Sequence, residues 1–378
     1  MNSFIRFFIL ILFCAGLFVV NCKAQKSVDS ETKWQVEPSL KYDTLCFLNV
    51  LTGDSFYQRF YAKEYARFEP HFTPQVRSAL TNLKSKVKDE NKNIVSAFLS
   101  LHFSASNAET LDDMLNALDE SKQIKVDLQK TVYYTKDGWR LFESIKNDLR
   151  IVLRFLQTER FDVYWREEIL PKVREKVGSI SEYLSNFDVV REVEKHLRFE
   201  LASKKIIVFA LYFSRPHGIR LTGNRFVTDI SYPTQVVLRV AIHELLHPPY
   251  DLSKDRELKK TLETLRSDEF LTSKIRNHNP AFGYNSFESF VEENCVRALD
   301  QIIGEKLGIK NDARQRWRDE DDGIHVLAAV LYDLMRQDKY DGRKESFRNF
   351  LFRVIRTGKL STGKIKSLYD NYYFTEQK

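Results

Sequence analysis

Two histidines four residues apart enclose an acid in the segment His243-Glu244-Leu245-Leu246-His247. On an α-helix, residues at this spacing lie on one face, so both imidazole rings can reach a single metal ion. Zinc is the natural ion for such nitrogen ligands. Glu244 follows the first histidine, where its carboxylate can take a proton from a water at the open metal position. The motif therefore predicts a catalytic zinc site with Glu244 as general base.

A catalytic zinc site needs a third protein ligand and keeps its fourth position for water. Residues 286–303 have apolar side chains at helical spacing, and Glu292 and Glu293 stand in the middle of this segment. Acids in an apolar helix are costly to bury unless they are paired or bind a metal. Arg297 follows Glu293 by four residues, so the two side chains can meet. We expect the third ligand here, with His278, in a loop-like context, as an alternative.

The elements that position the motif can be read from the residues before it. Residues 206–213 form an unbroken apolar run, which is typical of a buried strand, and residues 225–230 are a second candidate strand after a Gly-Asn turn. Pro233 then opens an amphipathic helix over residues 235–247. Pro248 follows His247 and disfavours helical conformation before it. The helix must therefore end at or just before His247.

The rest of the chain indicates a mainly helical α+β protein. Residues 41–202 are dominated by helical periodicity and contain little that looks catalytic. We expect a catalytic core over residues 203–310 and a helical C-terminal region over residues 311–378. The polar residues 25–40 are expected to be a flexible tether.

Residues 1–24 have the pattern of an export signal. Arg6 precedes an uncharged apolar stretch that is too short to span a bilayer comfortably. One route is cleavage after Ala24. The other is lipidation at Cys22, because the residues before it resemble a bacterial lipobox, although Asn21 departs from its usual small residue. Either route predicts an exported bacterial protein, secreted, periplasmic or anchored to a membrane by lipid.

Charge and cysteines limit the remaining functions. The net charge of +7 is mild and both signs are interleaved, which argues against a nucleic-acid partner. Residues 343–366 are strongly basic, but their apolar positions favour a packed helix with a solvated basic face over a membrane or polyanion site. Cys46 and Cys295 could form a disulfide after export.

The motif with a downstream acid resembles the gluzincin group of zinc metallopeptidases, and residues 293–298 resemble the third-ligand helix of poorly characterised exported bacterial members. The resemblance covers residues 204–303 and implies a zincin-like core, Zn²⁺ and hydrolysis of peptide bonds. It makes Glu293 the third ligand beside His243 and His247, with Glu292 or Glu288 in reserve. The prolines after His247 and a charged insertion over residues 251–280 depart from the pattern. Two acids of that insertion therefore stay open as ligands, Glu263 and Glu269.

The same resemblance implies a substrate strand and an oxyanion donor. The strand would be residues 225–230 or residues 218–221, and the donor would be Tyr284, His217 or Tyr250. The expected partner is a peptide or protein substrate. Two other functions stay open: hydrolysis of a non-peptide amide or ester, and a non-catalytic exported protein that keeps a zinc site for binding.

Overall fold

The computed structural model describes residues 31–252, 254–278, 282 and 284–374, and the chain from Glu31 onward forms one compact unit. It is mainly helical with one small sheet, which confirms the predicted α+β class. The expected export signal, with Cys22, lies outside the described residues. Among the helices that are described, none combines the length and the apolar character that crossing a bilayer requires.

The sheet has the strand order β1-β2-β4-β3. Strands β1 (Lys33–Glu37) and β4 (Arg225–Asp229) both run parallel to β2 (Lys205–Leu211), whereas the two-residue strand β3 (Ile219–Arg220) pairs antiparallel with β4. The strands predicted over residues 206–213 and 225–230 are therefore confirmed as β2 and β4.

The flexible tether expected over residues 25–40 is wrong from Lys33 onward. Lys33–Glu37 is strand β1, whose Trp34 lies opposite Ile206 of β2. The Trp34 indole donates a hydrogen bond to the carbonyl of Phe187 at 3.0 Å. The polar residues of this strand conceal it in the sequence, because its pairing partner is more than 150 residues away. Residues 25–30 lie outside the described part of the chain.

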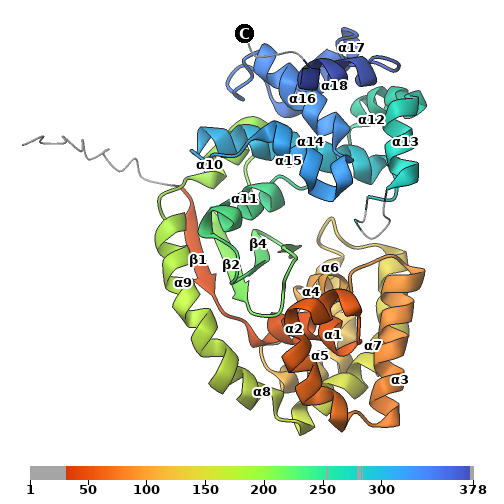
Figure 1. Ribbon diagram of the computed structural model, residues 1–378, viewed down its shortest axis with the longest axis vertical. Coiled ribbons are helices and arrows are strands. Elements are labelled where there is room, and N and C mark those ends of the chain that lie inside the picture. Colours follow the sequence, from red (N-terminus) through yellow and green to blue (C-terminus); the bar gives the residue numbers. More distant parts are fainter. Residues whose placement is uncertain (1–30, 253, 279–281, 283, 375–378) are drawn as a thin grey trace, which may run out of the picture. The chain divides into compact units, whose positions relative to one another are not determined.

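Helices cover both faces of the sheet. Helix α9 (Leu170–Leu184) packs on β1 and β2, and α11 (Thr234–Leu245) packs on β4. On the other side, α1 (Leu40–Leu51) contacts β2 and α4 (Val95–Phe103) contacts β3. Figure 1 shows α9 lying along β1, with α11 beside the sheet.

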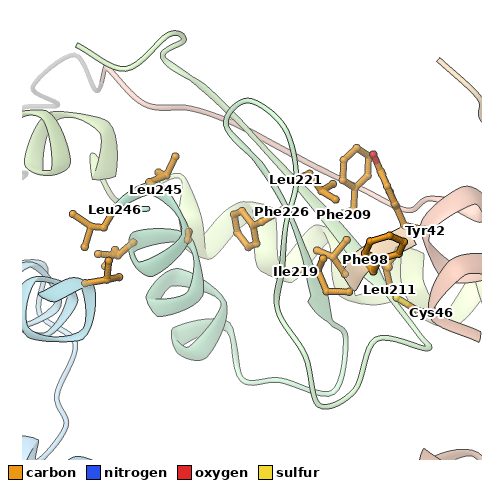
Figure 2. Close-up of a cluster of buried hydrophobic side chains, with 14 of the residues drawn as sticks. Tyr42, Cys46, Phe98, Phe209, Leu211, Ile219, Leu221, Phe226, Leu245 and Leu246 are labelled. Carbon is orange, nitrogen blue, oxygen red and sulfur yellow. The ribbon is translucent and has the colours of Figure 1, made fainter. Parts of the chain in front are cut away.

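Side chains of the strands alternate between these two layers, as the pleat requires. Figure 2 shows Phe226 of β4 between the strands and α11, whereas Phe209 and Leu211 of β2 lie on the side of Tyr42 and Cys46 from α1. The rings of Tyr42 and Phe209 are 4.7 Å apart. Burial on both faces explains why β2 is an unbroken apolar run.

The predicted helical region before the sheet is present. Its apolar periodicity over residues 141–156 belongs to α7, the longest helix of this part. Besides α1, α4 and α9, the helices are α2 (Ser55–Phe68), α3 (Pro74–Leu83), α5 (Leu111–Asp119), α6 (Ser121–Leu128), α7 (Lys136–Thr158), α8 (Phe161–Tyr164) and α10 (Val189–Leu197). Short turns are η1 (Glu69–His71), η2 (Lys84–Glu90) and η3 (Trp165–Ile169), of which η2 and η3 are π-helical.

The chain after α11 is also helical. Helix α14 packs on α11 and on α16, so it joins the motif helix to the C-terminal helices. The elements are α12 (Arg256–Glu263), η4 (Thr264–Ser267), α13 (Glu269–Asn277), α14 (Phe287–Lys306), α15 (Ala313–Asp319), η6 (Glu320–Gly323), α16 (Val326–Gln337), α17 (Phe347–Arg356) and α18 (Ile365–Phe374).

The basic segment over residues 343–366 contains α17, whose apolar residues are buried as predicted. Its cations are largely used in ion pairs. Arg348 pairs with Asp255 at 2.7 Å, and Arg353 pairs with Asp338 at 2.8 Å. Lys359 contacts the same Asp338 at 2.7 Å. Because these cations already have acidic partners, the ion pairs favour the interpretation of this segment as a solvated helix face over a polyanion-binding site.

The possible disulfide between Cys46 and Cys295 is absent, since both cysteines are free and buried. Cys46 lies on α1 near Asp43, whereas Cys295 lies on α14 near Tyr250. The two helices pack in different parts of the molecule, which is why spacing in the sequence could not decide the pairing.

His196, on α10, is a fully buried histidine whose ring nitrogens have no hydrogen-bond partner among the described residues. Burial lowers its pKa from 6.5 to about 4. The unfolded chain therefore takes up the proton first, and stability that is present above about pH 6.5 is lost as the pH falls toward 4. We predict that His196→Leu reduces the loss of unfolding free energy between about pH 7.5 and about pH 5 by about 2 kcal/mol. Urea unfolding at the two pH values measures this.

Val193 on the same helix provides the control for this substitution. It is fully buried and does not titrate, so Val193→Ala should lower the unfolding free energy by the same amount at both pH values. A His196→Leu variant that keeps the whole acid sensitivity of the unmodified chain would contradict the prediction.

Candidate metal centre

Three side chains converge at the end of α11. His243 lies on α11, His247 lies just beyond its end, and Glu293 reaches them from α14. The two Nε2 atoms are 3.1 Å apart, and the Glu293 carboxylate oxygens lie 3.7 Å from His243 Nε2 and 3.4 Å from His247 Nε2. Two ligand atoms on one tetrahedral zinc ion are about 3.4 Å apart, from bond lengths of about 2.0–2.1 Å. The spacing therefore fits a zinc ion.

The outer nitrogens of both rings are held by carboxylates. His243 Nδ1 lies 2.9 Å from Asp300, and His247 Nδ1 lies 3.1 Å from Glu292. An ionised carboxylate only accepts hydrogen bonds, so each ring carries a proton on Nδ1 and turns Nε2 toward Glu293. The two Nε2 atoms and the Glu293 carboxylate then face one point. A proton or a metal ion can lie between them, and carboxylates that orient the outer nitrogens are typical of histidines that bind a metal.

Asp300 is held in its ionised form by an arginine. Its side chain is fully buried and takes two hydrogen bonds from Arg316, one of them at 3.0 Å from Nη2. Burial alone would raise the pKa of Asp300, but Arg316 and His243 hold that pKa below its ordinary value. Asp300 is not among the residues predicted from the sequence. Its position seven residues after Glu293, two turns along the same helix, is the signal that could have found it.

Glu293 is clamped by Arg297, as its spacing suggested. Arg297 Nε lies 2.6 Å from the Glu293 carboxylate, and the same guanidinium also contacts Glu320, Asp321 at 2.9 Å and the Tyr284 hydroxyl at 3.3 Å. Burial opposes ionisation of Glu293, yet Arg297 and the two histidines hold its pKa well below the ordinary value. The carboxylate is therefore charged and fixed in orientation.

The pKa of His247 is raised, in contrast to the lowered pKa of Glu293. Burial favours the neutral ring, but the carboxylates of Glu292 and Glu293 outweigh it and raise the pKa of His247 to about 10. A positive charge at this ring is strongly stabilised by its surroundings. A proton or a metal ion can supply that charge.

The other ligand candidates do not join the cluster. The Glu292 side chain is 34% exposed and binds the outer nitrogen of His247, whereas the Glu293 side chain is 6% exposed and faces the inner nitrogens. The remaining candidates have partners elsewhere: Glu288 and Glu263 pair with Arg266, Glu269 pairs with Arg276, and His278 bonds to the carbonyl of Ile275.

Helix α11 ends at Leu245, which confirms the predicted end just before His247, although the range 235–247 is too long by two residues. The backbone still turns beyond that point, because the His247 amide donates to the Glu244 carbonyl at 3.4 Å. The prolines after His247 prevent the helix from continuing. The two histidine rings nevertheless meet, with centroids 4.9 Å apart.

Glu244 lines a cavity of about 820 Å³ together with His243. Among the described residues, its carboxylate has no hydrogen bond or ion pair. Its backbone is fixed, because the Arg220 guanidinium donates to the Glu244 carbonyl. An uncommitted carboxylate beside a metal cluster and an open cavity can accept a proton from water.

Two of the three oxyanion candidates line the same cavity. The Tyr284 hydroxyl accepts a hydrogen bond from Arg297, and burial raises the pKa of Tyr284 above its usual value. His217 Nε2 lies 2.9 Å from the Tyr57 hydroxyl, and burial lowers the pKa of His217 to about 4. The third candidate, Tyr250, is buried near Cys295 and is not among the lining residues.

The strand over residues 225–230 is wrong as a substrate-pairing edge, because β4 is already paired with β2 on one side and β3 on the other. The sheet has two edge strands, β1 and β3, and β3 is the one beside β4. Gly218, directly before β3, lines the cavity, and a β carbon there would lie 2.9 Å from Val240 of α11. The absence of a side chain therefore lets this edge approach the motif helix closely.

Comparisons of the chain with protein-family models, with curated proteins and with solved structures give no match. A function for the site therefore has to be argued from its geometry. Three convergent ligand atoms, two oriented imidazoles and one uncommitted carboxylate are the features on which a function can be built.

Proposed function

We propose that this protein is a zinc-dependent hydrolase that cleaves peptide bonds, with a zincin-like core of the gluzincin type. The observation that carries the proposal is the convergence of His243, His247 and Glu293, whose ligand atoms all lie within 4.8 Å of one another. Glu244 stands beside them in the cavity with an uncommitted carboxylate. Three ligands and an open side are typical of catalytic zinc sites, whereas structural sites are closed by four.

Each step of the proposed reaction can be attributed to a residue of the site. Zinc bound by the three ligands would supply a Lewis acid that polarises the scissile carbonyl and acidifies the attacking water. Glu244 takes a proton from that water and delivers it to the leaving amine. Tyr284 stays protonated and can donate to the developing oxyanion while Arg297 holds its oxygen. Asp300 and Glu292 keep both imidazoles in the ligating tautomer.

A peptide is the substrate that the cavity favours. An extended chain can pair with the free edge of the sheet at β3, directly beside Gly218 and the motif helix. We place this activity outside the cytoplasm, because residues 1–24 have the pattern of an export signal with a lipidation option at Cys22.

The test combines metal content with cleavage. Purified protein from residue 25 onward is loaded with zinc, dialysed and measured by elemental mass spectrometry, and is then incubated with a mixed peptide library. We expect about one zinc per chain and peptide cleavage that a chelator abolishes. A chain that holds no zinc would overturn the proposal. Zinc without cleavage of any peptide, ester or amide would instead support a binding role.

A further inference from the structure

The cavity beside the metal centre has a second wall, built by the N-terminal helical region. Its metal side comes from α11 and α14, whereas the opposite residues come from α1, α2 and the segment after α3. Three lysines of that segment line the cavity: Lys84, Lys88 and Lys92. We call these three residues the lysine wall.

A π-helical turn carries two of these lysines, and the third follows just after its end. Helix α3 continues into η2, a π-helical turn of the kind that often marks functional sites. Lys84 and Lys88 lie on η2, and Lys92 follows it in a turn with positive φ; all three line the same cavity. Lys86 on the same turn points elsewhere, since its amine bonds to the Ser144 carbonyl at 2.9 Å and lies 3.6 Å from Asp148.

The positive charge of the lysine wall is only partly compensated. Lys88 pairs with Asp54, the one acid that this side contributes to the lining. Lys92 donates to the carbonyl of Asp89, which carries no charge. Lys84 has no ion pair among the described residues. Asp54 also lies close enough to interact with Lys84, so one carboxylate faces the three cations of the wall.

The acids on the metal side cannot supply the remaining counter-charge. Glu320 and Asp321 are engaged by Arg297, and Asp300 is engaged by Arg316. Glu244 is the proposed base and lies at the metal centre. The wall therefore keeps a net positive charge toward the cavity, which would attract an anionic group of a bound molecule.

We infer that the lysine wall is a subsite for a carboxylate of the substrate, either an acidic side chain or the free C-terminus of a peptide. The inference rests on the proposed zinc hydrolase, because it assumes that the scissile bond is held at the metal centre. It assigns a substrate preference to the N-terminal helical region.

The experiment uses peptide hydroxamates, which bind zinc through the hydroxamate and need no turnover. Four probes share one length and differ at the far end: Asp or Asn as the side chain, each with a C-terminal carboxylate or amide. Calorimetry on the zinc-loaded protein measures the Kd of each probe. We expect the preferred carboxylate to improve binding about tenfold over its amide, and added salt to reduce that gain.

Variants locate the gain on the protein. Lys84→Gln and Lys92→Gln together should remove the preference for the carboxylate while the Kd of the Asn amide probe is unchanged, which also shows that the fold is intact. Lys86→Gln is the matched control and should keep the full preference. The carboxylate that improves the Kd, from the Asp side chain or from the C-terminus, is the group that the subsite binds.

The possible failures are distinct. Equal binding of all four probes to the unmodified protein overturns the lysine wall and leaves the zinc site standing. A carboxylate gain that survives the double substitution also overturns it. If no hydroxamate binds the zinc-loaded protein, the proposed zinc site and the inference that rests on it are both wrong.

Discussion

Glu244→Gln is expected to abolish hydrolysis while zinc stays bound. The amide has the shape of the carboxylate but cannot accept a proton from the attacking water, and a lost general base costs roughly 10²–10⁴ in rate. Glu244 is not among the three converging ligands, so the metal should remain at about one ion per chain. The fold should also tolerate the change, because the carboxylate has no hydrogen bond among the described residues. The readouts are kcat/KM on the best library peptide and zinc content.

Glu288→Gln is the matched control for this variant. Glu288 is an acid at the start of α14, it is largely exposed, and it pairs with Arg266 at 2.7 Å. Its removal should leave both activity and zinc unchanged. An unchanged rate in Glu244→Gln would exclude the base role and would favour a site that binds zinc without catalysis.

Local spacing pointed to both histidines and to the helix that supplies the third converging carboxylate. The interval between His243 and His247 spans the last turn of α11 and the turn that follows it, and the position of Glu293 before Arg297 is a property of α14. The burial cost of an acid in an apolar helix pointed to the right segment, since Glu293 is fully enclosed. The choice between Glu292 and Glu293 needed the structure, because adjacent residues differ by only 100° around the helix axis.

Contacts between distant segments could not be predicted in this way. Arg316 reaches Asp300 from α15, and β1 pairs with a strand more than 150 residues later. Each partner alone looks like an ordinary surface residue. The same reason hid the role of the N-terminal helical region, whose helices carry no recognisable motif yet form one side of the cavity. A role for its lysines becomes visible only in the structure, where they line the cavity beside the metal centre.

Stepwise removal of carboxylates from α14 is expected to lower zinc affinity in the order Glu293, Glu292, Glu288. Glu293→Gln removes a ligand and should weaken zinc binding by more than about 100-fold. Glu292→Gln leaves the ligands in place but replaces the charged acceptor at the outer nitrogen of His247 with a weaker neutral one, which should cost about 10–100-fold. Glu288→Gln should cost nothing, since its partner is Arg266. Competition with a zinc-binding dye measures all three affinities.

The order of these effects distinguishes a ligand from a residue that orients one. If Glu292→Gln weakened zinc binding more than Glu293→Gln, the more exposed carboxylate would be the ligand, and the buried ion pair of Glu293 with Arg297 would be structural. Loss of that buried pair would then appear in the unfolding of the zinc-free protein, because Arg297 would lose one partner while keeping Glu320 and Asp321. Unfolding measured without zinc separates the two contributions, since a substitution that only breaks a structural ion pair lowers the stability of the zinc-free protein, whereas loss of a ligand lowers zinc affinity.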